Sequence, residues 1–125
     1  TELLAAIDRK GLVWGIVTNK PQEFAEAIAA STPAMARCAI VVGSRPGVPL
    51  KPAPDGILRA LKELALKPEQ TLYTGDDRRD IEAGKAAGTS TLLALWGYRP
   101  KDADTSLWAP DFTASSPEDI IRLLP

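Results

Sequence analysis

Short continuous runs of apolar residues alternate along this chain with stretches in which apolar residues recur at helical spacing. The clearest run, Leu12–Val17, has the near-unbroken apolar character of a strand that is buried on both faces of a parallel sheet. The alternation favours an α/β domain, a three-layer Rossmann-like core with a mostly parallel sheet and helices on both faces. The other predicted strands are Cys38–Val42, Thr71–Thr74 and Ser90–Leu95, with a weaker edge strand at Asp111–Ala114.

Glycine and proline mark the predicted helix boundaries. The helix Arg78–Ala87 is expected to end at Gly88, because glycine readily takes the left-handed conformation that closes a helix. The stretch 44–54, rich in proline and glycine, is a predicted loop. With no internal repeat or linker, residues 1–125 are predicted to form one domain. Helices are predicted to start near Pro21, Pro54 and Pro117, because proline suits the first turn of a helix, and Ser116 is the predicted cap of the last one.

Composition and charge narrow the choice of partner. The formal net charge is −1, and the scattered lysines and arginines form no basic patch of the kind that binds nucleic acid or anionic membranes. No apolar run approaches the roughly 20 residues of a membrane-spanning helix. The single cysteine, Cys38, cannot form an internal disulfide, which favours a reducing cytoplasm. The chain has no histidine, so catalysis would rest on carboxylates, Lys, Ser or Thr, and a small molecule is the expected partner.

Polar residues follow the predicted strands, where ligands bind in open parallel sheets. Thr18 ends the first strand, Lys51 lies in the loop before a helix, and Asp76, Asp77 and Asp80 follow the third strand. Each has an ordinary explanation: a strand-end hydroxyl, a solvated cation, or acids that cap a helix. Asp76 fits that explanation least, because an additional acid adds repulsion that a bound cation would relieve. Together these groups suit a phosphate and a hard divalent cation such as Mg²⁺.

The order and spacing of these residues resemble motifs II, III and IV of haloacid dehalogenase-type phosphatases. The motif-like segments are Thr18 at a strand end, Lys51 within KPAP, and GDDRRD at 75–80. Three ordered motifs are much more specific than any one of them. The chain therefore resembles the C-terminal portion of such a phosphatase core, a partial haloacid dehalogenase-like fold. Similarity to the phosphoglycolate phosphatase branch covers roughly residues 1 to 98, through VWGIVTNKP (13–21), LYTGDD (72–77), DIEAG (80–84) and WGY (96–98).

The resemblance implies a role for each candidate residue. Thr18 and the backbone amide of Asn19 would donate hydrogen bonds to the phosphoryl group, and Lys51 would neutralise its charge and that of the nucleophile. The implied reaction is hydrolysis of a phosphate monoester through an aspartyl-phosphate. The substrate would be a small phosphorylated metabolite, with phosphoglycolate, a sugar phosphate and an amino-sugar phosphate all open. The implied Mg²⁺ ligands are Asp76 directly, Asp80 through water, and Asp77 in an assisting role.

The family's motif I, an apolar strand that ends in Asp-x-Asp-x-Thr, is not found upstream of Thr18. Because its first aspartate is the nucleophile, we expect the chain alone to be inactive. A partial match, DADT at 102–105, follows Arg99-Pro100-Lys101 rather than a buried strand. A receiver-like phosphoacceptor domain would place its acids before the threonine and lysine, and a true dehalogenase needs no carboxylate cluster. A non-catalytic remnant or phosphate-binding module of the same fold remains an alternative.

The motif I strand of the family lies between the strands that here end at Thr18 and Thr74. Without it both strands would have an unpaired edge, and such edges recruit other strands. We therefore expect an upstream fragment or a second copy to complete the sheet, or the strands to re-pair across the gap. We also expect Thr18 and Lys51 to converge on an anion within about 10 Å of each other.

Overall fold

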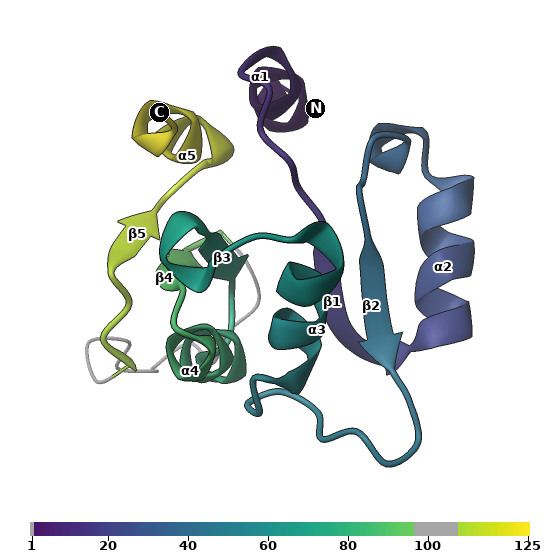
Figure 1. Cartoon of the computed structure of the whole chain (residues 1–125). Coiled ribbons are helices and arrows are strands. Elements are labelled where there is room, and N and C mark those ends of the chain that lie inside the picture. Colours follow the sequence, from purple (N-terminus) through teal and green to yellow (C-terminus); the bar gives the residue numbers. More distant parts are fainter. Residues whose placement is uncertain (1, 97–107) are drawn as a thin grey trace.

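The computed structural model describes residues 2–96 and 108–125, in which strands and helices alternate along the chain (Figure 1). This order confirms the predicted α/β class. Among these residues, no helix is both long and apolar enough to cross a bilayer. The helices are α1 (Glu2–Arg9), α2 (Gln22–Ser31), α3 (Asp55–Leu64), α4 (Arg78–Ala87) and α5 (Pro117–Leu123). The strands are β1 (Ile16–Pro21), β2 (Val41–Ser44), β3 (Leu72–Gly75), β4 (Ser90–Ala94) and β5 (Phe112–Ala114).

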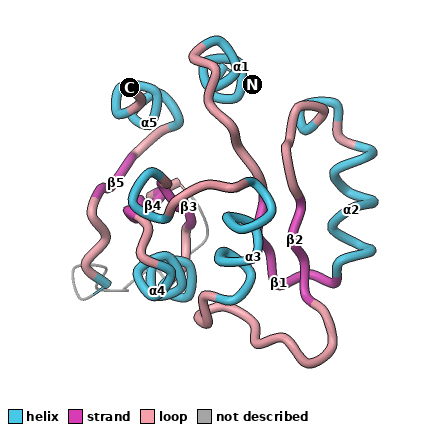
Figure 2. Tube along the Cα trace, viewed as in Figure 1, coloured by secondary structure: helices cyan, strands magenta, loops and turns pink. Residues whose placement is uncertain are grey.

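The strands form two separate parallel sheets (Figure 2). β1 pairs with β2, and the other sheet has the order β3-β4-β5. Within the described ranges, β1 and β3 do not pair, and no backbone–backbone hydrogen bond joins residues 2–66 to residues 67–125. β1 and β3 therefore each form the edge of a sheet. Re-pairing across the gap, one of the three expected outcomes, does not occur between these two strands.

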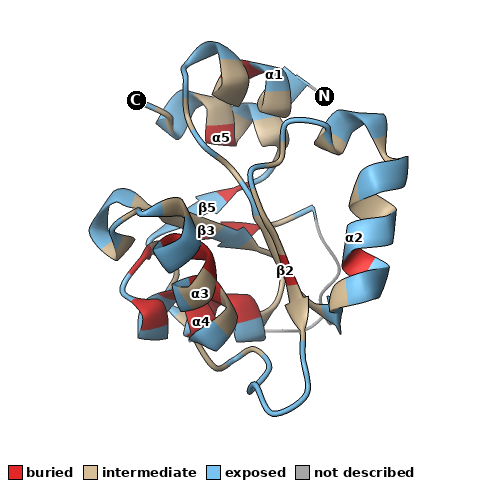
Figure 3. Ribbon diagram, turned by 45° about the vertical axis from the view of Figure 1, so that its right-hand side comes forward, coloured by how far each residue is buried: buried red, intermediate tan, exposed pale blue. Residues whose placement is uncertain are grey.

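Helices cover both faces of the sheets, as the sequence predicts. Adjacent residues of a strand point to opposite faces, and Leu72 and Tyr73 of β3 follow this rule. Tyr73 and Val17 pack against apolar residues of α3 and α4, while Leu72 packs on the side of α1 and α5. Figure 3 shows buried residues on the inner sides of α3 and α4. The two buried clusters are Ile57, Leu61, Ala83 and Ala87 on one face and Leu92, Ala114 and Ile120 on the other.

The first strand begins later than its apolar run predicts. β1 starts at Ile16 rather than Leu12. The parallel ladder nevertheless continues before it, because the backbone N–H of Ala39 donates to the carbonyl of Trp14 and that of Ile16 donates to Ile40. The predicted strand Cys38–Val42 is likewise shifted, since β2 covers Val41–Ser44.

The end of β1 also differs from the prediction, and the difference shapes the site. β1 runs past Thr18 to Pro21, which pairs with Ser44 after a shift of register that begins at Val17. Such an irregularity bends a strand and redirects its side chains. Pro21 is therefore the last strand residue, and α2 begins one position later, at Gln22.

Boundaries that depend on local signals match the predictions. α4 covers Arg78–Ala87, and Gly88 follows it in the left-handed conformation with φ of 85°. Ser116 precedes α5, whose first residue is Pro117. The weak edge strand is present as β5, parallel to β4.

Candidate functional site

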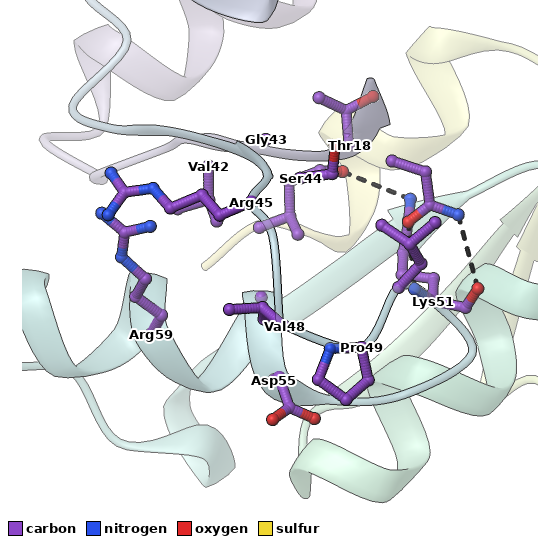
Figure 4. A pocket seen from close by; sticks show the side chains of 14 residues that line it. Thr18, Val42, Gly43, Ser44, Arg45, Val48, Pro49, Lys51, Asp55 and Arg59 are labelled. Carbon is purple, nitrogen blue, oxygen red and sulfur yellow. Dashed lines mark hydrogen bonds between the residues drawn. The ribbon is translucent and has the colours of Figure 1, made fainter. Parts of the chain in front are cut away.

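The side chain of Asn19 in β1 fixes the backbone of Lys51 (Figure 4). Oδ1 of Asn19 accepts a hydrogen bond from the backbone N–H of Lys51 at 3.0 Å, and Nδ2 of Asn19 donates to the Lys51 carbonyl at 3.4 Å. Oγ1 of Thr18 accepts from the backbone N–H of Lys20 at 3.2 Å. Thr18, Asn19 and Lys51 all line one small cavity of about 30 Å³. The structure thus brings together the three residues assigned to phosphate binding.

The side chain of Asn19 has a role that the sequence reasoning missed. Only its backbone amide was assigned, whereas its amide group is what ties the loop before α3 to the end of β1. The signal that points to this role is the residue type, because the amide group of asparagine commonly bonds to backbone groups. The backbone amide of Asn19 stays a predicted phosphate donor.

The ammonium group of Lys51 spans the space between the two sheets. Its Nζ lies 2.6 Å from Oδ1 of Asp80, 3.1 Å from Oη of Tyr73 and 3.2 Å from the carbonyl of Val17. Three donors thus meet three acceptors, the full capacity of a lysine. Burial alone would lower the pKa of Lys51, but the oxygens of Tyr73 and Asp80 outweigh it and raise that pKa above 10.5. Lys51 is therefore a cation at neutral pH.

Tyr73 is the second residue that sequence reasoning missed. Its ring packs in the cluster between α3 and α4, and its hydroxyl donates to the Val17 carbonyl at 3.2 Å. Burial raises the pKa of Tyr73 although Lys51 opposes the shift. A tyrosine in a predicted buried strand is itself a signal, because a buried phenol hydroxyl usually has a hydrogen-bond partner.

Asp80 links the start of α4 to Lys51. Its Oδ2 accepts from the backbone N–H groups of Asp76 at 3.2 Å and Asp77 at 3.3 Å, while Oδ1 accepts from Lys51. Asp77 completes a reciprocal capping box by accepting from the N–H of Arg79. This confirms the capping role considered for Asp77. Burial alone would raise the pKa of Asp77, but the hydrogen bonds and the charge of Arg79 together outweigh it and lower that pKa.

Asp76 and Asp80 face a larger cavity, of about 340 Å³, that opens between β1 and β3. Lys51 and Tyr73 share its lining, and Asp77 is not part of it. Within residues 2–96 and 108–125, no three His, Cys, Asp or Glu side chains are grouped to hold a metal ion. Mg²⁺ needs only one or two carboxylates when water and phosphate oxygens complete its shell. The pair Asp76 and Asp80 fits that smaller donor set.

Two sequence motifs lie partly or wholly outside the described residues. Trp96 lines the larger cavity, but Gly97 and Tyr98 of the WGY motif are outside the described ranges. The DADT segment at 102–105, set aside as a nucleophile motif, is outside them as well.

Comparison with known proteins places these residues in context. The chain is 39% identical over 123 residues to N-acetylmuramic acid 6-phosphate phosphatase of Pseudomonas aeruginosa, covering 98% of the chain and 54% of that protein. It is 38% identical over 120 residues to phosphoglycolate phosphatase of Xylella fastidiosa, covering 96% and 52% respectively. The chain thus spans about half the length of the curated relatives it matches.

Solved structures show the same fold. A crystal structure of a provisionally named phosphoglycolate phosphatase from Lactobacillus delbrueckii aligns with a TM-score of 0.88 at 21% identity, over 98% of this chain and 50% of that one. A haloacid dehalogenase-superfamily hydrolase from Ehrlichia chaffeensis aligns with a TM-score of 0.80 at 21% identity, over 98% of this chain and 54% of that one. Residues 1–94 match the model of the haloacid dehalogenase-like hydrolases. Since this match spans most of the chain and includes every candidate site residue, the chain belongs to the haloacid dehalogenase-like hydrolase family.

Proposed function

We propose that these residues form the phosphate- and metal-binding part of a Mg²⁺-dependent phosphate monoester hydrolase. The reaction would resemble that of phosphoglycolate phosphatase and proceed through an aspartyl-phosphate whose aspartate lies outside the 125 residues. The observation that carries the proposal is the position of Lys51. Its backbone is held beside Thr18 by Asn19, and its ammonium is 2.6 Å from Asp80 in the cavity that Asp76 also lines.

Each residue has a task in this proposal. The hydroxyl of Thr18 and the backbone N–H of Asn19 donate to phosphate oxygens at the carboxyl end of β1. Lys51 balances the negative charge of the phosphate, and Asp80 keeps the ammonium in place between the sheets. Preorganised donors of this kind stabilise charge that develops during phosphoryl transfer.

Asp76 would bind Mg²⁺ directly, and Asp80 would reach it through water. When bound, the ion would supply positive charge that polarises the phosphate oxygens. The cap formed by Asp77 holds the first turn of α4, so that the amide groups of Asp76 and Asp77 stay directed at Asp80.

The proposed partners are a substrate and a strand that completes the sheet. The substrate is a small phosphorylated metabolite, such as phosphoglycolate, a sugar phosphate or an amino-sugar phosphate, hydrolysed in the cytoplasm. A strand from an upstream segment or from a second copy fills the gap between β1 and β3, where both strands have free edges. Neither nucleic acid nor a membrane takes part.

Calorimetric titration of the chain with Mg²⁺ and with orthophosphate tests the binding groups. We expect Asp76→Asn to abolish Mg²⁺ binding and Asp77→Asn, its matched control, to leave it unchanged, because Asp76 lines the cavity and Asp77 does not. Thr18→Val should weaken orthophosphate binding by about tenfold through the loss of one charge-assisted hydrogen bond. Thr113→Val, on the exposed edge strand, is the control. Equal Mg²⁺ affinity in the two aspartate variants would contradict the metal assignment.

Turnover separates an enzyme from a non-catalytic remnant. The 125-residue chain is expected not to hydrolyse para-nitrophenyl phosphate, and addition of a segment with the Asp-x-Asp-x-Thr strand should give Mg²⁺-dependent hydrolysis. Persistent inactivity of the extended, folded and Mg²⁺-binding protein would favour the remnant. Turnover by the chain alone that is lost on replacing Asp102 or Asp104 would contradict the exclusion of the DADT segment.

A further inference from the structure

The small cavity beside Thr18 carries an excess of positive charge. Its charged lining residues are the cations Arg45, Lys51 and Arg59 and a single carboxylate, Asp55. This excess stands out because the whole chain has a formal net charge of −1. The proposed function accounts for Lys51 but leaves the two arginines without a role.

The two arginines come from different elements and both line the cavity. Arg45 directly follows β2, and Arg59 lies in α3. Figure 4 shows their side chains extending toward each other, with Lys51 on the other side of the view. Two guanidinium groups repel one another, and an anion between them would relieve that repulsion.

The charges of these arginines are only partly neutralised within the described residues. Nε of Arg59 lies 3.2 Å from Oε1 of Glu63, which leaves the terminal nitrogens of this guanidinium for another acceptor. The side chain of Arg45 makes no hydrogen bond or ion pair with any described residue. The first residues of α3, Asp55 and Gly56, also line the cavity, and the start of a helix carries partial positive charge.

The size of the cavity limits what it can take. Its volume of about 30 Å³ is too small for a whole metabolite. A planar carboxylate that enters from the open side would suit it, because a guanidinium binds a carboxylate through two parallel hydrogen bonds. Thr18 and Asn19 line the same cavity, so a phosphate held there and a carboxylate held by the arginines would belong to one molecule.

We propose that Arg45 and Arg59 form a subsite for a carboxylate group of the phosphorylated substrate. The inference rests on the proposed function, and it narrows the substrate class to phosphate monoesters that also carry a carboxylate. Arg45 and Arg59 are then specificity-determining residues, because a neutral phosphate ester would leave their charges unmatched.

Matched ligand pairs test the subsite on the 125-residue chain. 2-Phosphoglycolate is compared with ethyl phosphate, and 3-phosphoglycerate with glycerol 3-phosphate, so that each pair differs mainly in the carboxylate and the two pairs differ in length. We expect at least one acid to bind about tenfold more tightly than its neutral partner, the gain that a charge-assisted hydrogen-bonded pair gives. The gain should disappear in the double variant R45Q/R59Q. It should persist in R37Q/R78Q, which removes the same charge at two exposed arginines that do not line the cavity.

Nuclear magnetic resonance distinguishes a failure of the subsite from a failure of the proposed function. Binding of the acid should move the Nε–H signals of Arg45 and Arg59 together with the amide signals of Thr18 and Asn19. Amide shifts without arginine shifts, or equal arginine shifts with the neutral ester, would overturn the subsite and leave the proposed function in place. Arginine shifts without amide shifts would support a carboxylate site and overturn the proposed phosphate site. No shift at either place would overturn both.

Discussion

Replacement of Asp80 by asparagine would disrupt one of the two sets of hydrogen bonds that this side chain accepts. Oδ2 accepts two backbone N–H groups at the start of α4, and Oδ1 accepts from the ammonium of Lys51. An asparagine of the same shape has one acceptor oxygen and one donor NH₂ group. Whichever way the amide is turned, the NH₂ group faces other donors. The change therefore leaves either the helix amides or one N–H of the Lys51 ammonium without its acceptor, and it removes the negative charge that faces the ammonium.

The expected cost follows from the burial of the pair. The side chains of Lys51 and Asp80 are only 14% and 12% exposed, so solvent screens their interaction weakly. Loss of one partner of a buried ion pair costs about 3 to 5 kcal/mol. Because a little exposure remains and the volume is unchanged, we expect about 3 kcal/mol for Asp80→Asn. For a chain of this size that corresponds to a fall in Tm of roughly 10 °C.

Thermal and urea unfolding, followed by circular dichroism, would measure this cost. Asp77→Asn is the matched control, because asparagine is an equally good cap and the lost partner, Arg79, forms an exposed pair. We expect less than about 1 kcal/mol for the control. A cycle with Lys51→Met should show a coupling of about 2 kcal/mol with Asp80→Asn. Equal losses for Asp80→Asn and Asp77→Asn, or additive effects in the cycle, would refute this account of Lys51 and Asp80.

Two further predictions address Gly75 and Cys38. A Cβ at Gly75 would fall on the side chain of Asp80, so Gly75→Ala should destabilise the fold by more than about 2 kcal/mol, and an unchanged urea midpoint would contradict this. Burial raises the pKa of the Cys38 thiol above 9.0, so less thiolate is present at pH 8 than in an unshifted cysteine. Its alkylation by iodoacetamide should accelerate as the pH rises through 9 and beyond, and a rate that levels off below pH 9 would be inconsistent with the raised pKa.

The limits of α4 could be predicted because they depend on local chemistry. Asp77 caps the first turn, Gly88 takes the left-handed conformation after the last turn, and both residues directly flank the helix in the sequence. The end of β1 could not be predicted in this way. Its register shift arises from pairing with Ser44, far along the chain, and a local apolar pattern carries no information about such a partner.

In the site, too, the approximate position of a residue along a strand could be predicted from the sequence, but its contacts with residues far along the chain could not. The topology of a parallel sheet predicts that Thr18 and Asp76 lie at strand ends; Asp76 does follow the last residue of β3, whereas Thr18 lies within β1, three residues before its end. The topology does not predict that the ammonium of Lys51 takes a carbonyl of β1 and a hydroxyl of β3 as partners. Those contacts depend on the distance between two sheets that are not paired with each other, which a linear pattern cannot give.

The lack of backbone–backbone hydrogen bonds between the two described parts of the chain has a consequence for how these parts are held together. Within the described ranges, no backbone–backbone hydrogen bond joins residues 2–66 to residues 67–125, and side chains such as Lys51 join the two parts. A break in the peptide chain next to Leu66 would therefore interrupt no ladder. The two fragments would keep complementary surfaces, the apolar faces of α3 and α4 and the ion pair of Lys51 with Asp80. We therefore expect two fragments produced by cleavage next to Leu66 to be able to reassociate through these surfaces.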